Sequence, residues 1–148
     1  MIIFPLTSQD SLWRPTADFA DSCSWRAGKW LAEQMHQGSF SDWERVFVAV
    51  DEERIMGFCT LAKTDCIVDV PYTPYVGYVF VDEAFRGHRL SEKLIVAAAD
   101  YARTLGFDRV YLVSDHENLY ERFGFVKIDE KPAPWNPDVM ESIFARDT

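Results

Sequence analysis

The chain has few cysteines, and their spacing is not that of a metal site. The three residues Cys23, Cys59 and Cys66 are odd in number and widely separated, so we expect neither a disulfide framework nor a bound structural metal. Because free cysteine is among the most often buried residue types, we interpret all three as small apolar side chains. This cysteine usage fits a reducing compartment and predicts a cytoplasmic protein.

Long apolar runs, internal repeats and low-complexity segments are also missing. Residues 1–10 begin with apolar residues but have no basic region before them and no long apolar stretch after them, so we expect neither a signal peptide nor a membrane span. No repeat or linker divides the chain. A chain of 148 residues is long enough to bury one sizeable core, and we predict a single domain over residues 1–148.

Basic residues are scarce relative to acidic ones. The chain has 15 Lys and Arg against 24 Asp and Glu, which gives a formal net charge of -9. Nucleic acids and anionic lipids are bound through clustered Lys and Arg, so this balance argues against both as partners. It mildly favours a cationic acceptor, although net acidity also serves solubility.

Apolar spacing and turn residues predict the elements of the first half. Three- and four-residue steps over 16–37 place Phe19, Trp30 and other apolar residues on one face of a helix that ends near Gly38. Runs rich in β-branched and aromatic residues predict strands, and a charged turn joins the first two as a hairpin. These strands are 45–50, 55–62 and 75–81.

The second half of the chain alternates between segments with helical spacing and segments typical of strands. Residues 90–105 have helical spacing and are followed by Gly106 at the expected cap. Asp115 is placed to cap a short helix that carries Tyr120. Strands are predicted at 109–114, 125–128 and 139–144. This order of units predicts an α/β fold with a mixed central β-sheet flanked by helices.

A basic turn joins the third predicted strand to the helix at Leu90. The first amides of a helix lack internal partners and carry partial positive charge, so such a junction favours an anion. Arg86 and Arg89 add formal charge there, and His88 lies between them. A bound pyrophosphate is one interpretation, and a solvated helix start is the other.

This segment resembles the acetyl-CoA signature of the GNAT acetyltransferases, in which Arg/Gln-x-x-Gly-x-Gly/Ala follows a strand. Arg86 fills the first position, and Gly87 is the small residue that commonly follows it. Arg89 stands where the family has its first required glycine, and Ser91 replaces the final glycine or alanine. A side chain at such a turn crowds a phosphate, so Arg89 either points away or pairs with the phosphate directly.

A second landmark follows about two dozen residues later. Tyr120, Gly124 and Phe125 match the tyrosine on a short helix and the Gly-Phe pair of the same family, over a resemblance that covers residues 55–128 in order. Asn118 lies closer to the tyrosine than the asparagine of many members, and a local cap is its other interpretation. The resemblance implies a single-domain GNAT-like fold and acetyl-CoA as the acetyl donor. The residues it implies for cofactor binding are Val79, Val81, Arg86, Gly87, His88, Arg89, Ser91 and Asn118, with backbone contacts at the two valines.

The resemblance also implies a catalytic role for Tyr120. In thioester aminolysis an amine attacks the acetyl carbonyl and a thiolate leaves, and a tyrosine with a pKa of about 10 keeps a proton to give to that sulfur. A packed core aromatic is the alternative. The implied reaction is acetyl transfer to the amine of a small molecule or peptide.

Several features stay open in the sequence. No carboxylate lies on the strand 75–81, so no general base is named, and water can carry the proton away. Tyr72, Tyr75 and Trp135 lie beside prolines and are our hypothesis for an acceptor pocket wall. A noncatalytic acyl-CoA-binding module is the main alternative, and a nucleic-acid or protein-interaction module is a third. GNAT relatives are often dimers, so a homodimer is an open option, with Trp135 at its interface.

Overall fold

The computed structural model describes residues 1–148. Its seven strands form where β-branched and aromatic residues gather, and they make one sheet. The order across the sheet is β1-β2-β3-β4-β5-β7-β6. The strands are β1 (Ile2–Leu6), β2 (Arg45–Asp51), β3 (Arg54–Ala62), β4 (Tyr75–Val81), β5 (Arg109–Ser114), β6 (Val126–Ala133) and β7 (Asn136–Asp147). Only β4 and β5 pair in parallel, and the other neighbours are antiparallel. The predicted mixed sheet is confirmed.

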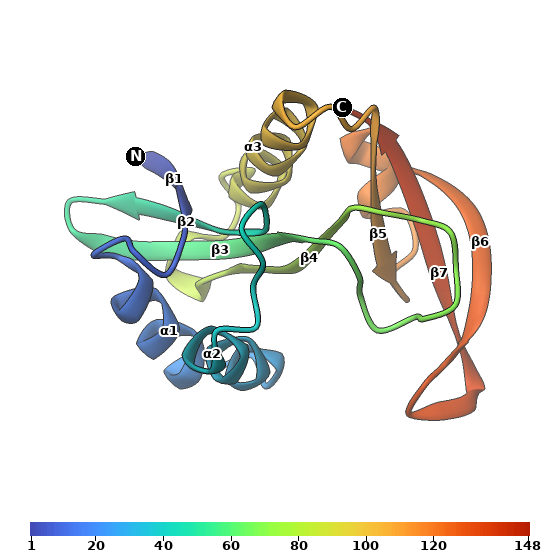
Figure 1. Cartoon of the computed structure of the whole chain (residues 1–148), viewed down its shortest axis with the longest axis horizontal. Coiled ribbons are helices and arrows are strands. Elements are labelled where there is room, and N and C mark those ends of the chain that lie inside the picture. The colour runs from blue at the N-terminus through green and yellow to red at the C-terminus, as the bar shows by residue number, and fades with distance from the viewer.

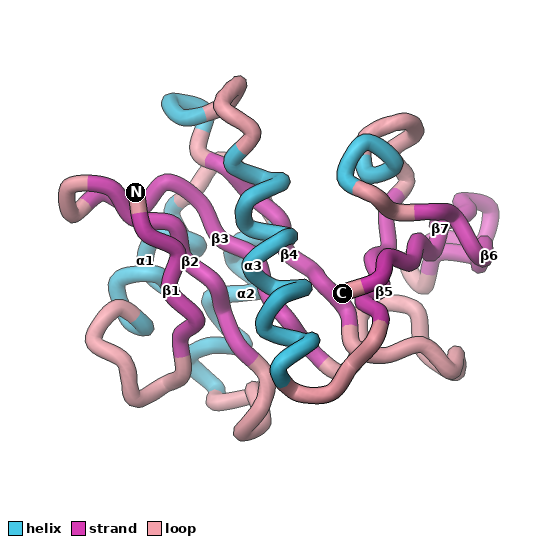
Figure 2. Tube along the Cα trace, turned by 90° about the horizontal axis from the view of Figure 1, so that it is seen from above, coloured by secondary structure: helices cyan, strands magenta, loops and turns pink.

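Three helices cover the two faces of the sheet (Figure 1). The helix α3 (Leu90–Thr104) lies over one face, and α1 (Trp13–Ser22) and α2 (Ala27–Gln37) lie over the other. Each face therefore has its own apolar core. The view from above shows α3 crossing the strands β3 and β4 (Figure 2). None of the helices is long and apolar enough to cross a membrane.

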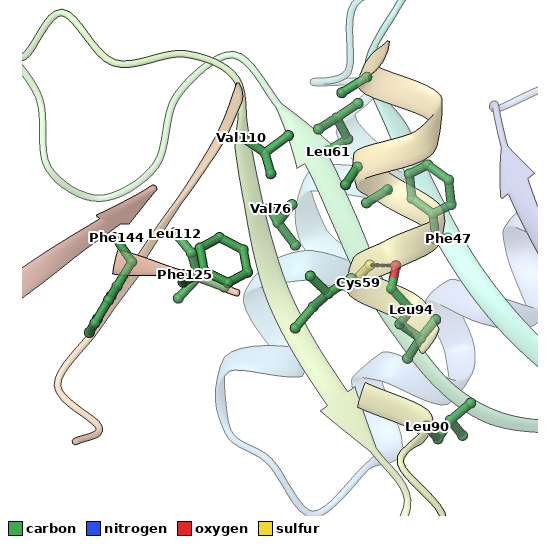
Figure 3. Close-up of a cluster of buried hydrophobic side chains, with 14 of the residues drawn as sticks. Phe47, Cys59, Leu61, Val76, Leu90, Leu94, Val110, Leu112, Phe125 and Phe144 are labelled. Carbon is green, nitrogen blue, oxygen red and sulfur yellow. Dashed lines mark hydrogen bonds between the residues drawn. The ribbon is translucent and has the colours of Figure 1, made fainter. Parts of the chain in front are cut away.

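The core beneath α3 joins the two halves of the sheet. Phe47 and Leu61 come from the β2–β3 hairpin, whereas Val110 and Phe144 come from β5 and β7 (Figure 3). Cys59 is fully buried there and lies 3.5 Å from the Leu94 carbonyl oxygen, to which its thiol donates. Burial raises the pKa of this thiol, so Cys59 is a structural residue, as predicted from its residue type. The same prediction was wrong for Cys23 and Cys66, which are only partly buried.

The prediction of one helix over 16–37 was wrong, because the chain folds back between α1 and α2. Cys23 is extended, with φ -70° and ψ 164°. The two helices then approach so closely that a Cβ on Gly28 would lie 2.4 Å from the Ala20 carbonyl oxygen. This fold-back also turns Trp30 outward, where it is 59% exposed. Gly38 ends α2 in the left-handed conformation, as predicted.

The predictions for the remaining elements were mostly confirmed. Helix α3 ends before Gly106, which has a φ of 93°, and β5 has the predicted bounds. The N-terminal strand β1 was not predicted, and β6 and β7 extend well beyond the predicted strands. Asp115 does not cap the 3₁₀ turn η2 (Tyr120–Phe123), because that turn begins after Leu119 and has no side-chain cap. Another 3₁₀ turn, η1 (Glu83–Phe85), precedes α3.

Candidate functional site

A cleft opens where the two parallel strands separate. Strands β4 and β5 pair at one position, Tyr75 opposite Tyr111, and the Tyr111 N–H donates to the Pro74 carbonyl at 2.9 Å. Beyond this pair the strands diverge toward their C-terminal ends (Figure 1). A cavity of about 1390 Å³ lies between them and is lined by both strands and by the segments that follow each strand.

A β-bulge interrupts β4 along the wall of this cleft. Phe58 lies opposite Phe80 and Thr60 lies opposite Gly77, so Tyr78 and Val79 together face a single residue of β3. Tyr78 adopts a φ of 48° to accommodate the extra residue. Because β4 pairs with β5 only at Tyr75, the edge of β4 that faces β5 has no strand partner beyond this residue, and its backbone groups are available to an extended ligand lying along β4. Val79 and Val81 line the cleft, and their partly buried side chains pack against the α3 core.

The turn between β4 and α3 forms one end of the cleft. The Arg86 Nε donates to the Val81 carbonyl at 3.0 Å, and its guanidinium lies 5.7 Å from the centre of the Phe80 ring. Gly87 has a φ of 89°, and a Cβ there would meet no atom within 4 Å. The turn therefore has free space at Gly87, beside the guanidinium of Arg86, which its contacts with Val81 and Phe80 hold in place. Gly87 and Ser91 both line the cleft.

Arg89 takes the place of a glycine in conformation as well as in sequence. It has a φ of 59° and a ψ of 28°, in the left-handed region that favours glycine, and it is the first flanking residue of α3. Its guanidinium pairs with Glu92 at 2.8 Å, and 73% of its side chain is exposed. Arg89 lines the cleft, and its charge lies at the solvent-exposed edge of the cleft.

Tyr120 lies on the opposite wall, on the 3₁₀ turn that follows β5. Its ring packs against Phe123, Phe125 and Phe144 at centroid distances of 6.2 to 6.3 Å. Burial is the largest cause that raises the pKa of its hydroxyl, and the charge of Asp115 adds to it. A phenol with a raised pKa keeps its proton at neutral pH. Tyr120 therefore carries a protonated hydroxyl at neutral pH and lines the same cleft as the β4–α3 turn.

Two of the residues predicted to bind the cofactor are not brought to the cleft wall. His88 is exposed, and the cleft lining skips from Gly87 to Arg89. Asn118 is also exposed, with a φ of 61°, and its N–H faces the Glu121 carboxylate at 3.3 Å. The structure brings together Val79, Val81, Arg86, Gly87, Arg89, Ser91 and Tyr120.

The three aromatic residues of the predicted pocket wall separate in the structure. Tyr75 and Trp135 line the cleft. Tyr72 does not line it, because its hydroxyl donates to Asp129 on β6 at 2.9 Å and its ring packs on Tyr111. Asp129 thus holds Tyr72 against β6, away from the cleft.

The sequence reasoning missed two acidic residues of the cleft lining whose pKa is raised by burial. Asp65 lies in the loop between β3 and β4, and Glu141 lies on β7 and is 6% exposed. Burial is the main cause that raises the pKa of both carboxyls. A charged residue inside the apolar run 139–144 was the signal for Glu141, whereas no local pattern marks Asp65.

The whole chain was compared with known proteins. The model of the acetyltransferase (GNAT) family matches residues 9–125. A curated relative, N-alpha-acetyltransferase 30 of Saccharomyces cerevisiae, is 30% identical over 94 residues, which are 57% of this chain and 53% of the relative. The chain therefore spans about half the length of that relative.

Solved structures share the fold across nearly the whole chain. An aminoglycoside 6'-acetyltransferase type Ii superposes with a TM-score of 0.74 at 18% identity, covering 99% of this chain and 97% of its own. A GNAT family acetyltransferase from Elizabethkingia anophelis, solved with acetyl-CoA bound, has a TM-score of 0.67 at 16% identity and the same two coverages. At these identities the likeness concerns the fold. With the family model matching most of its residues, the chain belongs to the GNAT acetyltransferase family.

Proposed function

We propose that this protein transfers the acetyl group of acetyl-CoA to the amine of a small molecule or peptide, with Tyr120 as the general acid. The observation that carries the proposal is one cleft with an anion-binding turn on one wall and a protonated tyrosine on the other. Family membership supports acetyl transfer as the reaction.

The geometry of β4 fits the donor. The edge of β4 at Val79 and Val81, beyond the single pair with β5, suits the pantetheine arm as an added strand. The open turn at Gly87, with Arg86 and Arg89 at its sides, suits the pyrophosphate. Ser91 adds a hydroxyl at the start of α3. A structural neighbour is described as complexed with coenzyme A, which supports the same ligand here.

The reaction proceeds by direct attack on the thioester. The neutral amine nitrogen forms a bond to the acetyl carbon, the carbon–sulfur bond breaks, and Tyr120 gives its proton to the departing thiolate. The nitrogen loses its proton to water in the open cleft, and solvent reprotonates Tyr120. Burial of Tyr120 helps this step because it holds the phenol in its protonated form.

Binding of the donor is the first test. Acetyl-CoA, desulfo-CoA and ATP are titrated into the protein by calorimetry, together with the Arg86→Ala, Arg89→Ala double variant. The matched control is the Arg14→Ala, Arg109→Ala double variant, which removes the same charge outside the cleft lining. We expect acetyl-CoA and desulfo-CoA to bind, with a loss of about tenfold or more in the cleft variant alone. Absence of binding by the unmodified protein would refute the proposal.

A noncatalytic acyl-CoA-binding module is the second candidate. It is favoured by Arg89 in the place of a glycine and by the lack of a carboxylate on β4. Turnover separates the two candidates: thiol release from acetyl-CoA in the presence of an amine panel supports the enzyme, whereas tight donor binding without thiol release with any amine supports the module.

A further inference from the structure

Charges of opposite sign line different parts of the cleft. Arg86 and Arg89 follow the C-terminal end of β4, together with Glu83. The rest of the lining has no Lys or Arg. Its charged and titratable residues outside the tyrosines and cysteine are Glu44, Asp65, Asp115, Glu141 and His116.

Asp65 lies directly against the β4 wall. Its Oδ2 is 2.9 Å from the position that a Cβ on Gly77 would take, and the Thr60 Oγ1 is 3.2 Å from the same point. Its other oxygen accepts the Cys66 N–H at 2.6 Å. No basic side chain pairs with this carboxylate. Because Gly77 has no side chain, the Asp65 carboxylate, which has no basic partner, fits inside the cleft.

Glu141 approaches the same region from β7. It directly precedes Ser142, which pairs with Ser114 at the end of β5, so it lies beside the point where the chain leaves β5 for Tyr120. It is 6% exposed and has no ion-pair partner. The charges of Asp115 and Asp65 add to burial in raising the pKa of Glu141, whereas the charge of His116 lowers it.

A buried hydroxyl without a partner marks the same place independently. Tyr75 lines the cleft and is 1% exposed, yet its hydroxyl oxygen has no hydrogen-bond partner. Burial and the charge of Asp65 raise the pKa of Tyr75 to about 12, so the group is a neutral phenol. A buried polar atom without a partner costs free energy, and a bound ligand can relieve that cost.

We propose that Asp65, Glu141 and the Tyr75 hydroxyl form an acceptor subsite for an aliphatic polyamine that carries two ammonium groups besides the neutral amine nitrogen that is acetylated. The two carboxylates bind ammonium groups, and the phenol oxygen accepts a further N–H. One ammonium of the acceptor would leave one of the two buried anions without a counterion, whereas a dication neutralises both. The inference rests on the proposed function, because it names the class of amine that this cleft acetylates.

Direct binding tests the subsite without turnover. Cadaverine, with an ammonium at each end, is titrated by calorimetry into the full chain loaded with desulfo-CoA. Pentylamine and aminopentanol have the same carbon chain and one charge. We expect cadaverine to bind about tenfold more tightly than either, which corresponds to about one charge-assisted hydrogen bond.

Variants assign the binding to the three residues. Asp65→Asn and Glu141→Gln each keep the side-chain shape and should weaken cadaverine binding by about tenfold, while desulfo-CoA affinity stays the same. Tyr75→Phe should weaken it less, because the lost hydrogen bond has a neutral partner. Asp138→Asn is the matched control, since it removes an exposed charge from the same strand β7. Circular dichroism melts confirm that each variant is folded.

Each outcome has one meaning. Equal affinity for cadaverine and pentylamine, full affinity in the Asp65→Asn and Glu141→Gln variants, or no amine binding to the desulfo-CoA-loaded protein would overturn the subsite. A peptide amide with a single ammonium that binds as tightly as cadaverine would also overturn it, in favour of a peptide acceptor. Failure of desulfo-CoA itself to bind would instead overturn the proposed function.

Discussion

Replacing Tyr120 by phenylalanine tests the proposed chemistry at a single atom. The change removes the hydroxyl and keeps the ring, whose contacts with Phe123, Phe125 and Phe144 hold it at the edge of the α3 core. We therefore expect the free energy of unfolding to change by less than about 0.5 kcal/mol. The donor affinity should also stay the same, because the pantetheine and pyrophosphate contacts proposed here lie on β4 and α3.

The expected loss appears in the chemical step. A positioned general acid contributes roughly 10²- to 10⁴-fold to a rate, which corresponds to about 3 to 5 kcal/mol of activation free energy. Because burial raises the pKa of Tyr120 above its ordinary value, the unmodified protein should hold its activity up to about pH 10. Above its raised pKa the acid loses its proton and kcat falls. The variant should lack this alkaline decline.

The assay follows thiol release from acetyl-CoA with a chromogenic disulfide, at saturating amine and over a pH series. Tyr111→Phe is the matched control, because Tyr111 lies on the strand that leads to Tyr120 but does not line the cleft. A Tyr120→Phe protein with a kcat within about twofold of the unmodified protein would remove Tyr120 from the mechanism. A fall in donor affinity equal to the fall in kcat/KM would assign the residue to binding instead.

Three further substitutions test the walls of the cleft. Gly57→Ala should lower the free energy of unfolding by about 1 to 3 kcal/mol in urea titrations, because its Cβ would lie 2.5 Å from the Phe80 carbonyl oxygen; an unchanged midpoint would contradict this geometry. Glu141→Gln should raise the melting temperature at pH 7. The folded-state pKa of Glu141 is raised, so its ionisation opposes folding above about pH 4.5, and the gain should vanish in melts at lower pH. Gly77→Ala should displace the Asp65 carboxylate and weaken cadaverine binding in calorimetry by about tenfold while desulfo-CoA binding is retained; unchanged cadaverine affinity would contradict the placement of Asp65.

Local sequence was sufficient for the elements that we propose to bind the donor. The run of β-branched and aromatic residues in β4 and the helical spacing of α3 with Gly106 after it depend on neighbours within a few residues, and the observed bounds agree with the predicted ones. The basic turn at Arg86 and the position of Tyr120 on a short helical turn were recognised in the same way. These features are contiguous in the chain, so a linear motif contains them.

The spacing of apolar residues did not predict how the helices α1 and α2 pack. The apolar steps over 16–37 continue across the break at Cys23, because two helices that pack on one sheet face present the same periodicity as one longer helix. Only the close contact of Gly28 with Ala20 explains why the chain must fold back. The same fold-back decides that Trp30 faces solvent although its spacing predicted a core position.

Tertiary structure alone decided which carboxylates come together in the proposed acceptor subsite. Asp65 and Glu141 are far apart in sequence, and they share one cleft because β7 lies beside β5 in the sheet and the β3–β4 loop closes over the start of β4. Their burial, which raises their pKa values and leaves them without cationic partners, depends on distant chain segments that exclude water. The sequence by itself thus determined the family, the basic turn and the candidate acid, while the sheet order decided which carboxylates line the proposed amine subsite.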